Sequence, residues 1–187
     1  QFEYIRKSVL AFNLPSIELI NFEADDLIAT YSKKIIDSGG KVTIVSSDKD
    51  LMQLYKKNIR IYDPMKNKFI NQDDINNKFG VKPEKIIDVQ ALAGDSSDNV
   101  PGVPGIGVKT AAELINQYGD LENLLKNLKK IKQKKRRETL IENKEKAIIS
   151  KKLVTLRSDA PVKEKIDDFG LKQIDKEKLY GFLREME

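Results

Sequence analysis

The chain contains neither cysteine nor histidine among its 187 residues. Without cysteine there are no disulfides and no thiolate metal sites. Without histidine the chain cannot build Ser–His–Asp or Cys–His catalysis, or an ordinary zinc site. Any bound metal must therefore have oxygen ligands, which favours Mg²⁺ or Mn²⁺. No apolar run approaches the length of a membrane span, so no membrane partner is expected.

Charge, by contrast, is abundant. Charged residues make up 34% of the chain and hydrophobic residues 40%, a balance typical of a soluble globular protein. The net charge of +5 permits a polyanionic partner, although heavy use of Lys, Asn and Ile also follows from a coding bias toward A and T. The chain begins with Gln1 inside a helical pattern, so we expect it to be part of a longer protein.

Hydrophobic periodicity predicts an α/β core followed by a helical lobe. The expected elements of the first part are helices at 2–12, 27–36 and 51–54 and strands at 17–20, 42–45, 59–62 and 69–70. This alternation predicts a mainly parallel sheet flanked by helices over residues 1–82. Residues 83–187 are predicted to be helical, with breaks at glycine and proline.

Within the helical part, one helix is expected to end at Gly94 and another to run from 111 to 118 with Thr110 as its N-cap. A helix over 144–156 is expected to bury Ala147, Ile148, Leu153 and Leu156. A last helix over 175–186 is expected to place Leu179, Phe182 and Leu183 on one face. The basic run at 126–137 fits a solvated linker or arm as well as it fits a DNA contact.

Three acidic clusters occur where strands or helices end: Glu23, Asp25 and Asp26; Asp48 and Asp50; Asp95 and Asp98. Each cluster alone is explained by helix capping or a turn. The first two, however, are expected at the carboxyl edge of a parallel sheet, where ligands bind. Seven converging carboxylates need neutralising cations, and Lys49 is the only base among them. We therefore expect two divalent metals, an arrangement that hydrolyses phosphodiesters without a histidine base.

The third cluster runs directly into a glycine–proline loop, GVPGIG at 102–107, followed by Lys109 and a helix. A glycine-rich loop lets the backbone approach a ligand closely, and a helix start with free N–H groups favours a phosphate. The loop does not follow the order of the dinucleotide-binding fingerprint. The sequence therefore predicts a phosphate contact beside a metal site.

The motifs EADD at 23–26, SDKD at 47–50 and GDSSDNVPGVPGIGVKTA at 94–111 resemble those of the 5′→3′ exonuclease domain of bacterial DNA polymerase I, within the flap endonuclease superfamily. The resemblance implies a truncated PIN-like core and a helical lobe with a helix–three-turn–helix motif. It implies catalytic roles for Asp48, Asp50, Asp95 and Asp98, and a metal shell completed by Glu23, Asp25 and Asp26. It also implies duplex-DNA contacts from Gly102, Val103, Gly105, Ile106, Gly107, Lys109 and Thr110, with a K⁺ ion at the 102–107 loop.

The same resemblance implies two-metal hydrolysis of RNA primers and 5′ flaps in DNA replication and repair, in a bacterial cytoplasmic enzyme associated with the nucleoid and fused to polymerase domains. The family's domain begins with a strand that carries a further metal-binding Asp, followed by a helical arch, and neither precedes Gln1. We therefore expect this chain alone to bind duplex DNA and to cleave it weakly.

Two other functions compete with this one. A non-catalytic duplex-binding module would use the glycine loop and keep the acids for structure. A PIN-like ribonuclease would share the acidic sheet edge, but the GVPGIG loop argues against it. Metal titration separates the nuclease from the binding module, because a binding module has no need of seven carboxylates.

Overall fold

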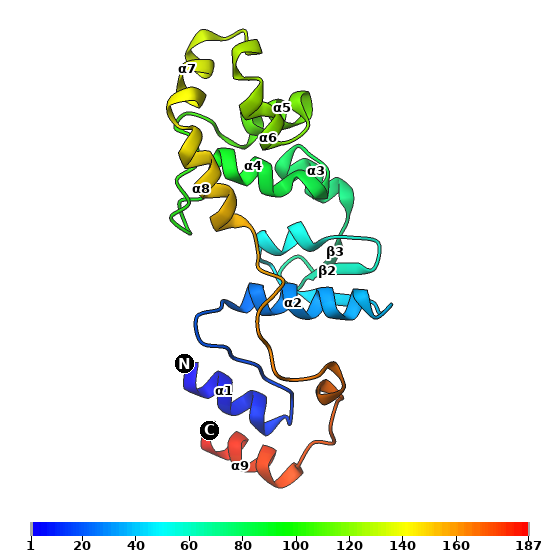
Figure 1. The fold of residues 1–187 in the computed structure, drawn as a ribbon. Coiled ribbons are helices and arrows are strands. Elements are labelled where there is room, and N and C mark those ends of the chain that lie inside the picture. The colour runs from blue at the N-terminus through cyan, green and yellow to red at the C-terminus, as the bar shows by residue number, and fades with distance from the viewer. Residues whose placement is uncertain (1, 187) are drawn as a thin grey trace.

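The computed structural model describes residues 2–186, and three layers follow one another along the molecule (Figure 1). The helical lobe lies at one end, α2 and a small sheet lie in the middle, and the first and last helices lie at the other end. The α-helices are α1 (Phe2–Ala11), α2 (Ala24–Asp37), α3 (Gln72–Phe79), α4 (Ile86–Ala93), α5 (Val108–Tyr118), α6 (Leu121–Lys126), α7 (Lys134–Glu142), α8 (Lys144–Val154) and α9 (Lys176–Met186). Short 3-10 helices are η1 (Asp50–Leu54), η2 (Pro83–Lys85), η3 (Leu128–Lys130) and η4 (Ile166–Phe169). No helix in this described part is both long and apolar enough to cross a membrane.

The sheet has three strands in the order β1 (Val42–Val45), β2 (Ile59–Asp63) and β3 (Lys68–Ile70). β1 and β2 are parallel, with Ile44 opposite Ile61, and β3 returns antiparallel to β2. β2 is the central strand, and its alternate residues are buried on one face of the sheet. The α/β core with a parallel β1–β2 pair is therefore confirmed, and the return strand at 69–70 is antiparallel.

The predicted strand at 17–20 is wrong. Residues 17–20 lie in an irregular segment before α2, and no strand within residues 2–186 pairs with them. Ile20 is 86% exposed, so this apolar run does not fill the core. An isolated run of apolar residues makes a strand only when a partner strand supplies its hydrogen bonds.

One core joins the sheet to the helical lobe. Its buried residues come from the sheet, from η1 and from helices α3 to α8, and α4 lies at its centre between α5 and α8. Ile86, Val89 and Leu92 of α4 are all completely buried. The predicted end of this helix is confirmed, since Gly94 is its C-cap, with φ of 71°.

The helical lobe differs from the sequence prediction in three places. Helix α5 begins at Val108 and has the extended residue Gly107 as its N-cap, so Thr110 lies inside the first turn and is not the cap. Leu153 is 59% exposed, and Val154 points into the core in its place. The basic run at 126–137 is not a free arm, because the buried side chains of Leu128 and Ile131 anchor it.

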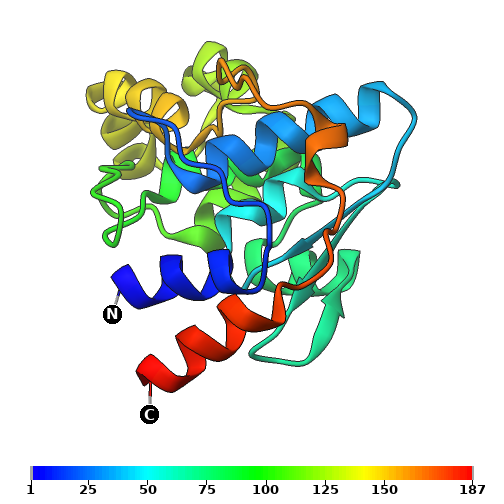
Figure 2. The same ribbon diagram turned by 90° about the horizontal axis from the view of Figure 1, so that it is seen from below.

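After α8 the chain leaves the helical lobe and returns along α2 (Figures 1 and 2). Tyr31 of α2 packs edge-on against Phe169, with ring centroids 4.9 Å apart, and its hydroxyl donates to the Glu164 carbonyl. Helix α9 then lies beside α1, and Lys7 pairs with Glu185 at 2.8 Å. The segment at 155–186 thus brings α9 against α1 on the side of the α/β core.

Candidate metal and nucleic-acid site

The carboxylates from the three acidic clusters meet in one hollow of about 430 Å³ between the α/β core and the helical lobe. Six of the seven predicted metal-binding residues line it: Glu23, Asp25, Asp48, Asp50, Asp95 and Asp98. Asp26 is not among the lining residues, and its Oδ1 accepts the backbone N–H of Arg157 at 2.8 Å. The geometry thus brings together the clusters that lie far apart in the sequence, whereas the Asp26 carboxylate is bonded to the returning C-terminal segment.

The SDKD loop follows β1 and is held by hydrogen bonds on both sides. Asp48 accepts the backbone N–H of Asp50 at 2.9 Å, which starts η1. Before it, Ser47 donates from Oγ to Oδ1 of Asp63 at 2.7 Å. Asp63 ends β2, is only 1% exposed, and also pairs with Lys66 at 2.8 Å. These hydrogen bonds, that from Lys66 first, hold the pKa of Asp63 well below its ordinary value.

Asp63 is a positioning residue that the sequence motifs do not indicate. Its position could have been recognised from the sequence, because an acid at the end of the strand beside β1 can reach the neighbouring loop. Its carboxylate faces the loop and not the hollow.

The second acidic loop is closed at its base by a pair of backbone hydrogen bonds between Asp95 and Val100, at 3.0 and 2.8 Å. Two glycines pack against each other beneath it. A Cβ on Gly102 would lie 2.5 Å from the backbone nitrogen of Gly94, and Gly102 has φ of 58°, so only glycine fits. The Gly102 N–H donates to Oγ of Ser150 on α8, which is completely buried. Ser150 is a second positioning residue that the sequence did not indicate.

Asp50, Asp95 and Asp98 come closest together. Each offers a carboxylate oxygen, and these three oxygens lie within 4.8 Å of one another. The ammonium of Lys49 contacts Asp95 directly, and this hydrogen bond holds the pKa of the Asp95 carboxyl below its ordinary value. Gln90 of α4 donates from Nε2 to Oδ1 of Asp50 at 2.5 Å. Asp50 and Asp95 are therefore each held by a contact from the opposite lobe.

Within residues 2–186, Asp95 is the only acid of the hollow to which an ion pair is assigned. Burial, followed by repulsion from Asp48 and Asp50, raises the pKa of the Asp25 carboxyl to about 6. Burial also raises the pKa of Asp50, and the hydrogen bond from Gln90 offsets part of that effect. One lysine among six carboxylates leaves a site that attracts further positive charge.

The glycine–proline loop places its residues in two groups. Val103 and Ile106 are buried, and their N–H groups donate within the protein, to the carbonyls of Leu92 and Val103. Because the amide of Gly102 is also engaged, three of the predicted DNA contacts anchor the loop and do not face solvent.

The other group faces outward. Gly105, Gly107 and Lys109 are exposed, and Thr110 is half-buried. Within residues 2–186, no acceptor is assigned to the amides of Gly105, Gly107 and Lys109. They surround the N-terminus of α5, where the helix dipole adds positive potential. The exposed half of the predicted DNA contacts therefore lies at the start of α5 and the two glycines before it.

The fold and the site define a PIN-like core with an acidic hollow, joined to a helical lobe that carries a glycine-rich loop. Family models agree with this architecture. The model of the 5′-3′ exonuclease N-terminal resolvase-like domain matches residues 1–80, and that of the 5′-3′ exonuclease C-terminal SAM fold matches residues 81–177. The chain belongs to the 5′-3′ exonuclease family.

Curated relatives match over the whole chain. DNA polymerase I of Rhizobium leguminosarum is 54% identical, and the chain spans 18% of that protein. A 5′-3′ exonuclease of Aquifex aeolicus is 40% identical, and the chain spans 63% of it. The chain thus corresponds to less than two thirds of the length of these relatives.

Solved structures of similar fold include the 5′-exonuclease of bacteriophage T5 with divalent zinc ions, at a TM-score of 0.77 and 23% identity. That match covers 99% of this chain and 67% of the T5 chain. The catalytic core of Rad2 in complex with DNA has a TM-score of 0.63 and 19% identity, covering 98% of this chain and 63% of that one. These likenesses extend over both lobes and confirm the predicted fold.

Proposed function

We propose that this chain contributes the metal-dependent active site of a 5′→3′ exonuclease and 5′-flap endonuclease. The observation that carries the proposal is the meeting of Asp50, Asp95 and Asp98, whose carboxylate oxygens lie within 4.8 Å of one another. The T5 structure with zinc ions and the Rad2 structure with DNA support the same assignment. Nothing in the site favours a purely structural use of the acids.

The donor set suits Mg²⁺ or Mn²⁺, because it consists of carboxylates alone and its acids repel one another. We assign Asp48, Asp50, Asp95 and Asp98 to hold the ions. Glu23 and Asp25 face the same hollow and would complete the shell. When bound, two such ions supply an activated water and stabilise the leaving oxygen of a phosphodiester.

Other residues of the site position these carboxylates and the substrate. Gln90 and Lys49 orient Asp50 and Asp95, and Ser47 with Asp63 holds the loop that carries Asp48. The start of α5, with Lys109, would grip the phosphates of duplex DNA without reading its bases. A K⁺ ion bound by carbonyls of the 102–107 loop would strengthen that grip.

The relatives suggest the wider setting. Because several are DNA polymerase I, we propose that this region is covalently continuous with polymerase domains and acts on 5′ flaps or RNA primers. We place this nuclease activity in the bacterial cytoplasm, at the nucleoid.

The proposal is tested with a labelled 5′-flap duplex in the presence of Mn²⁺ or of Mg²⁺, and Mn²⁺ binding is titrated in parallel. We expect cleavage that stops with a chelator, and loss of both cleavage and Mn²⁺ binding in Asp98→Asn. The matched control is Asp167→Asn, which changes an exposed acid on η4 that does not line the hollow. Unchanged Mn²⁺ affinity in Asp98→Asn would show that the site is misassigned.

A further inference from the structure

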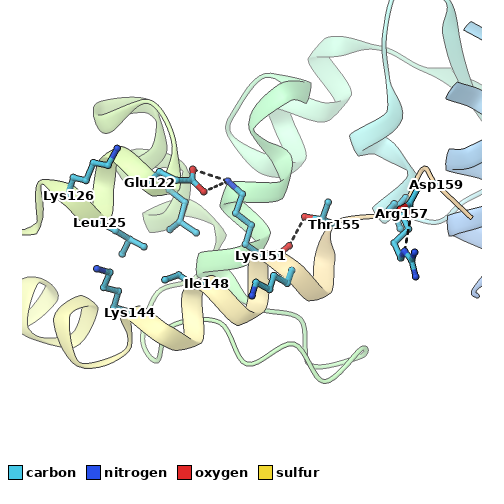
Figure 3. A pocket seen from close by; sticks show the side chains of 12 residues that line it. Glu122, Leu125, Lys126, Lys144, Ile148, Lys151, Thr155, Arg157 and Asp159 are labelled. Carbon is cyan, nitrogen blue, oxygen red and sulfur yellow. Dashed lines mark hydrogen bonds and ion pairs between the residues drawn. The ribbon is translucent and has the colours of Figure 1, made fainter. Parts of the chain in front are cut away.

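A second hollow lies beside the acidic one and shares Leu156 with it. It has a volume of about 810 Å³ and lies between α6, α8 and the segment at 155–159 (Figure 3). Its floor is apolar and consists of Leu121, Leu125, Ile148 and Leu156. Leu125 of α6 and Ile148 of α8 lie on facing sides of it. We call it the lysine-rimmed groove, after the side chains that surround this floor.

The rim carries an excess of positive charge: five basic residues against two acidic ones. Two of the basic residues are already neutralised. Lys151 pairs with Asp88 at 2.6 Å and with Glu122 at 2.8 Å, and Arg157 pairs with Asp159 at 3.1 Å.

The other three basic residues are Lys126, Lys144 and Lys152. They are exposed, and they form no ion pair within the described residues 2–186. They stand around the groove on both α6 and α8. The groove therefore presents three available cations around an apolar floor.

The floor of the groove presents apolar surface that a ligand could cover. Leu125 and Leu156 are half-buried, each packed against the core on one side and lining the groove on the other. A ligand seated there would remove this apolar surface from water, which stabilises a complex by roughly 25 cal/mol for each Å² buried. The volume lies within the range of about 300–1,000 Å³ that is common for binding pockets.

The geometry points to an acidic amphipathic protein segment as the occupant of the lysine-rimmed groove. We infer that its leucine-like side chains enter between α6 and α8, while its carboxylates pair with Lys126, Lys144 and Lys152. A groove between two helices is the usual seat of such a segment when it binds as a helix. This inference is independent of the nuclease assignment, since none of the acids that meet at 4.8 Å lines the groove.

A single strand of nucleic acid would also meet positive charge here, but the floor does not suit it. Proteins that bind single strands stack the bases on aromatic side chains. No residue that lines the groove is aromatic within the described part of the chain. Aliphatic walls instead fit branched aliphatic side chains, so the protein segment is favoured.

The test uses a fluorescent amphipathic peptide of about 15 residues, with leucine on one face and glutamate flanking it. We expect it to bind the chain with a Kd of about 10 μM or tighter, and more weakly as salt is added. The same peptide with lysine in place of glutamate is expected to bind at least about tenfold more weakly. A dT oligonucleotide of similar length is the third probe.

A triple variant that reverses the charge of the rim carries Lys126→Glu, Lys144→Glu and Lys152→Glu. It is expected to bind the acidic peptide at least about tenfold more weakly and to bind the basic peptide more tightly. The matched control is Lys129→Glu, Lys135→Glu and Lys146→Glu, which makes the same charge change at exposed lysines outside the groove. In the same assay, Ile148→Asp is expected to abolish binding while Mn²⁺ affinity is unchanged.

Three results would overturn the inference: no binding of the acidic peptide at millimolar concentration, an equal loss in the rim and control variants, or equal binding of the acidic and basic peptides. Rim-dependent binding of the dT oligonucleotide in preference to the peptide would assign the groove to nucleic acid instead. A failure of Mn²⁺ binding in the wild-type chain would bear only on the proposed nuclease site.

Discussion

Gln90 donates from Nε2 to Oδ1 of Asp50 at 2.5 Å, and this bond joins α4 of the helical lobe to the acidic loop after β1. The Gln90 side chain is almost wholly buried, at 4% exposure, and its Oε1 has no partner within residues 2–186. A buried amide that donates to a carboxylate fixes the direction in which the carboxylate points. The orientation of Asp50 thus depends on how the two lobes pack.

We predict that Gln90→Leu weakens Mn²⁺ binding about ten- to hundredfold, the range seen when a group that orients a metal ligand is removed. The fold should survive, because leucine is close to glutamine in volume and the change also removes the unpartnered Oε1. Mn²⁺ titration together with urea unfolding measures both effects. Gln117→Leu, on the exposed face of α5, is the matched control. Equal Mn²⁺ affinity in the two variants would contradict the positioning role.

Metal should also stabilise the fold. At a hundredfold excess over Kd, Mn²⁺ is expected to raise the free energy of unfolding by about 2.7 kcal/mol, because it binds only the folded chain. Asp48→Asn and Asp98→Asn should each reduce this gain, since both residues line the acidic hollow. Thermal unfolding with and without Mn²⁺ measures it. A melting temperature that ignores millimolar Mn²⁺ in the wild-type chain would argue against the metal site.

Lys109 provides a test of the DNA surface. It is exposed in the first turn of α5, beside amides to which no acceptor is assigned within residues 2–186. Lys109→Ala should weaken all duplexes alike and lower the slope of log affinity against log salt by about one, because a phosphate contact carries no base information. Lys57→Ala, in the exposed turn before β2, is the control. A loss that depends on the base sequence would count against a phosphate role.

Much of the site could be predicted from sequence, because its motifs are local. SDKD follows a strand and GDSSDN follows a helix that ends at glycine, so their carboxylates emerge at predictable edges. The rule that ligands bind at the carboxyl ends of parallel strands accounts only for Asp48 and Asp50, which follow β1. The first and third clusters adjoin α2 and α4, so their place in the same hollow depends on how these helices pack.

The contacts that hold the site could not be predicted in the same way. Asp63, Gln90 and Ser150 act across 16, 40 and 48 residues of sequence, and their roles depend on which elements pack together. The failure at 17–20 has a similar cause, because apolar composition is local but strand pairing is not. The predicted N-cap, Thr110, lies three residues after the observed one. Glycine also serves as an N-cap, and Gly107 takes that role here.

The close packing of Gly94 and Gly102 predicts a large loss of stability in Gly102→Ala. A Cβ there would come within 2.7 Å of the Ala93 carbonyl carbon, and the residue has a positive φ. Strain and clash together are expected to cost more than about 2 kcal/mol. Gly181→Ala is the matched control, because Gly181 lies inside α9 with open space around it. Alanine there should raise the free energy of unfolding by up to about 1 kcal/mol. Equal unfolding midpoints for the two variants would contradict this account of the loop.

Through Asp63, the stability of the fold is expected to depend on pH. Hydrogen bonds from Lys66 and then Ser47 hold the pKa of Asp63 below its ordinary value in the folded protein. The folded state therefore binds this proton less readily than the unfolded state. The resulting stability is fully present above the unfolded pKa of about 4, and it is lost as pH falls through the folded pKa. Asp63→Asn removes this contribution, so the variant should be less stable at pH 7 and lose less stability between about pH 5 and pH 2. Urea unfolding across that range measures the slope, with Asp37→Asn at the exposed end of α2 as the control. A slope of stability against pH equal to that of the wild-type chain would show that the bonds to Lys66 and Ser47 do not stabilise the charged form of Asp63.

The same substitution should also affect the metal site. Because Ser47 precedes Asp48, Asp63→Asn should weaken Mn²⁺ binding, whereas Asp37→Asn should leave it unchanged.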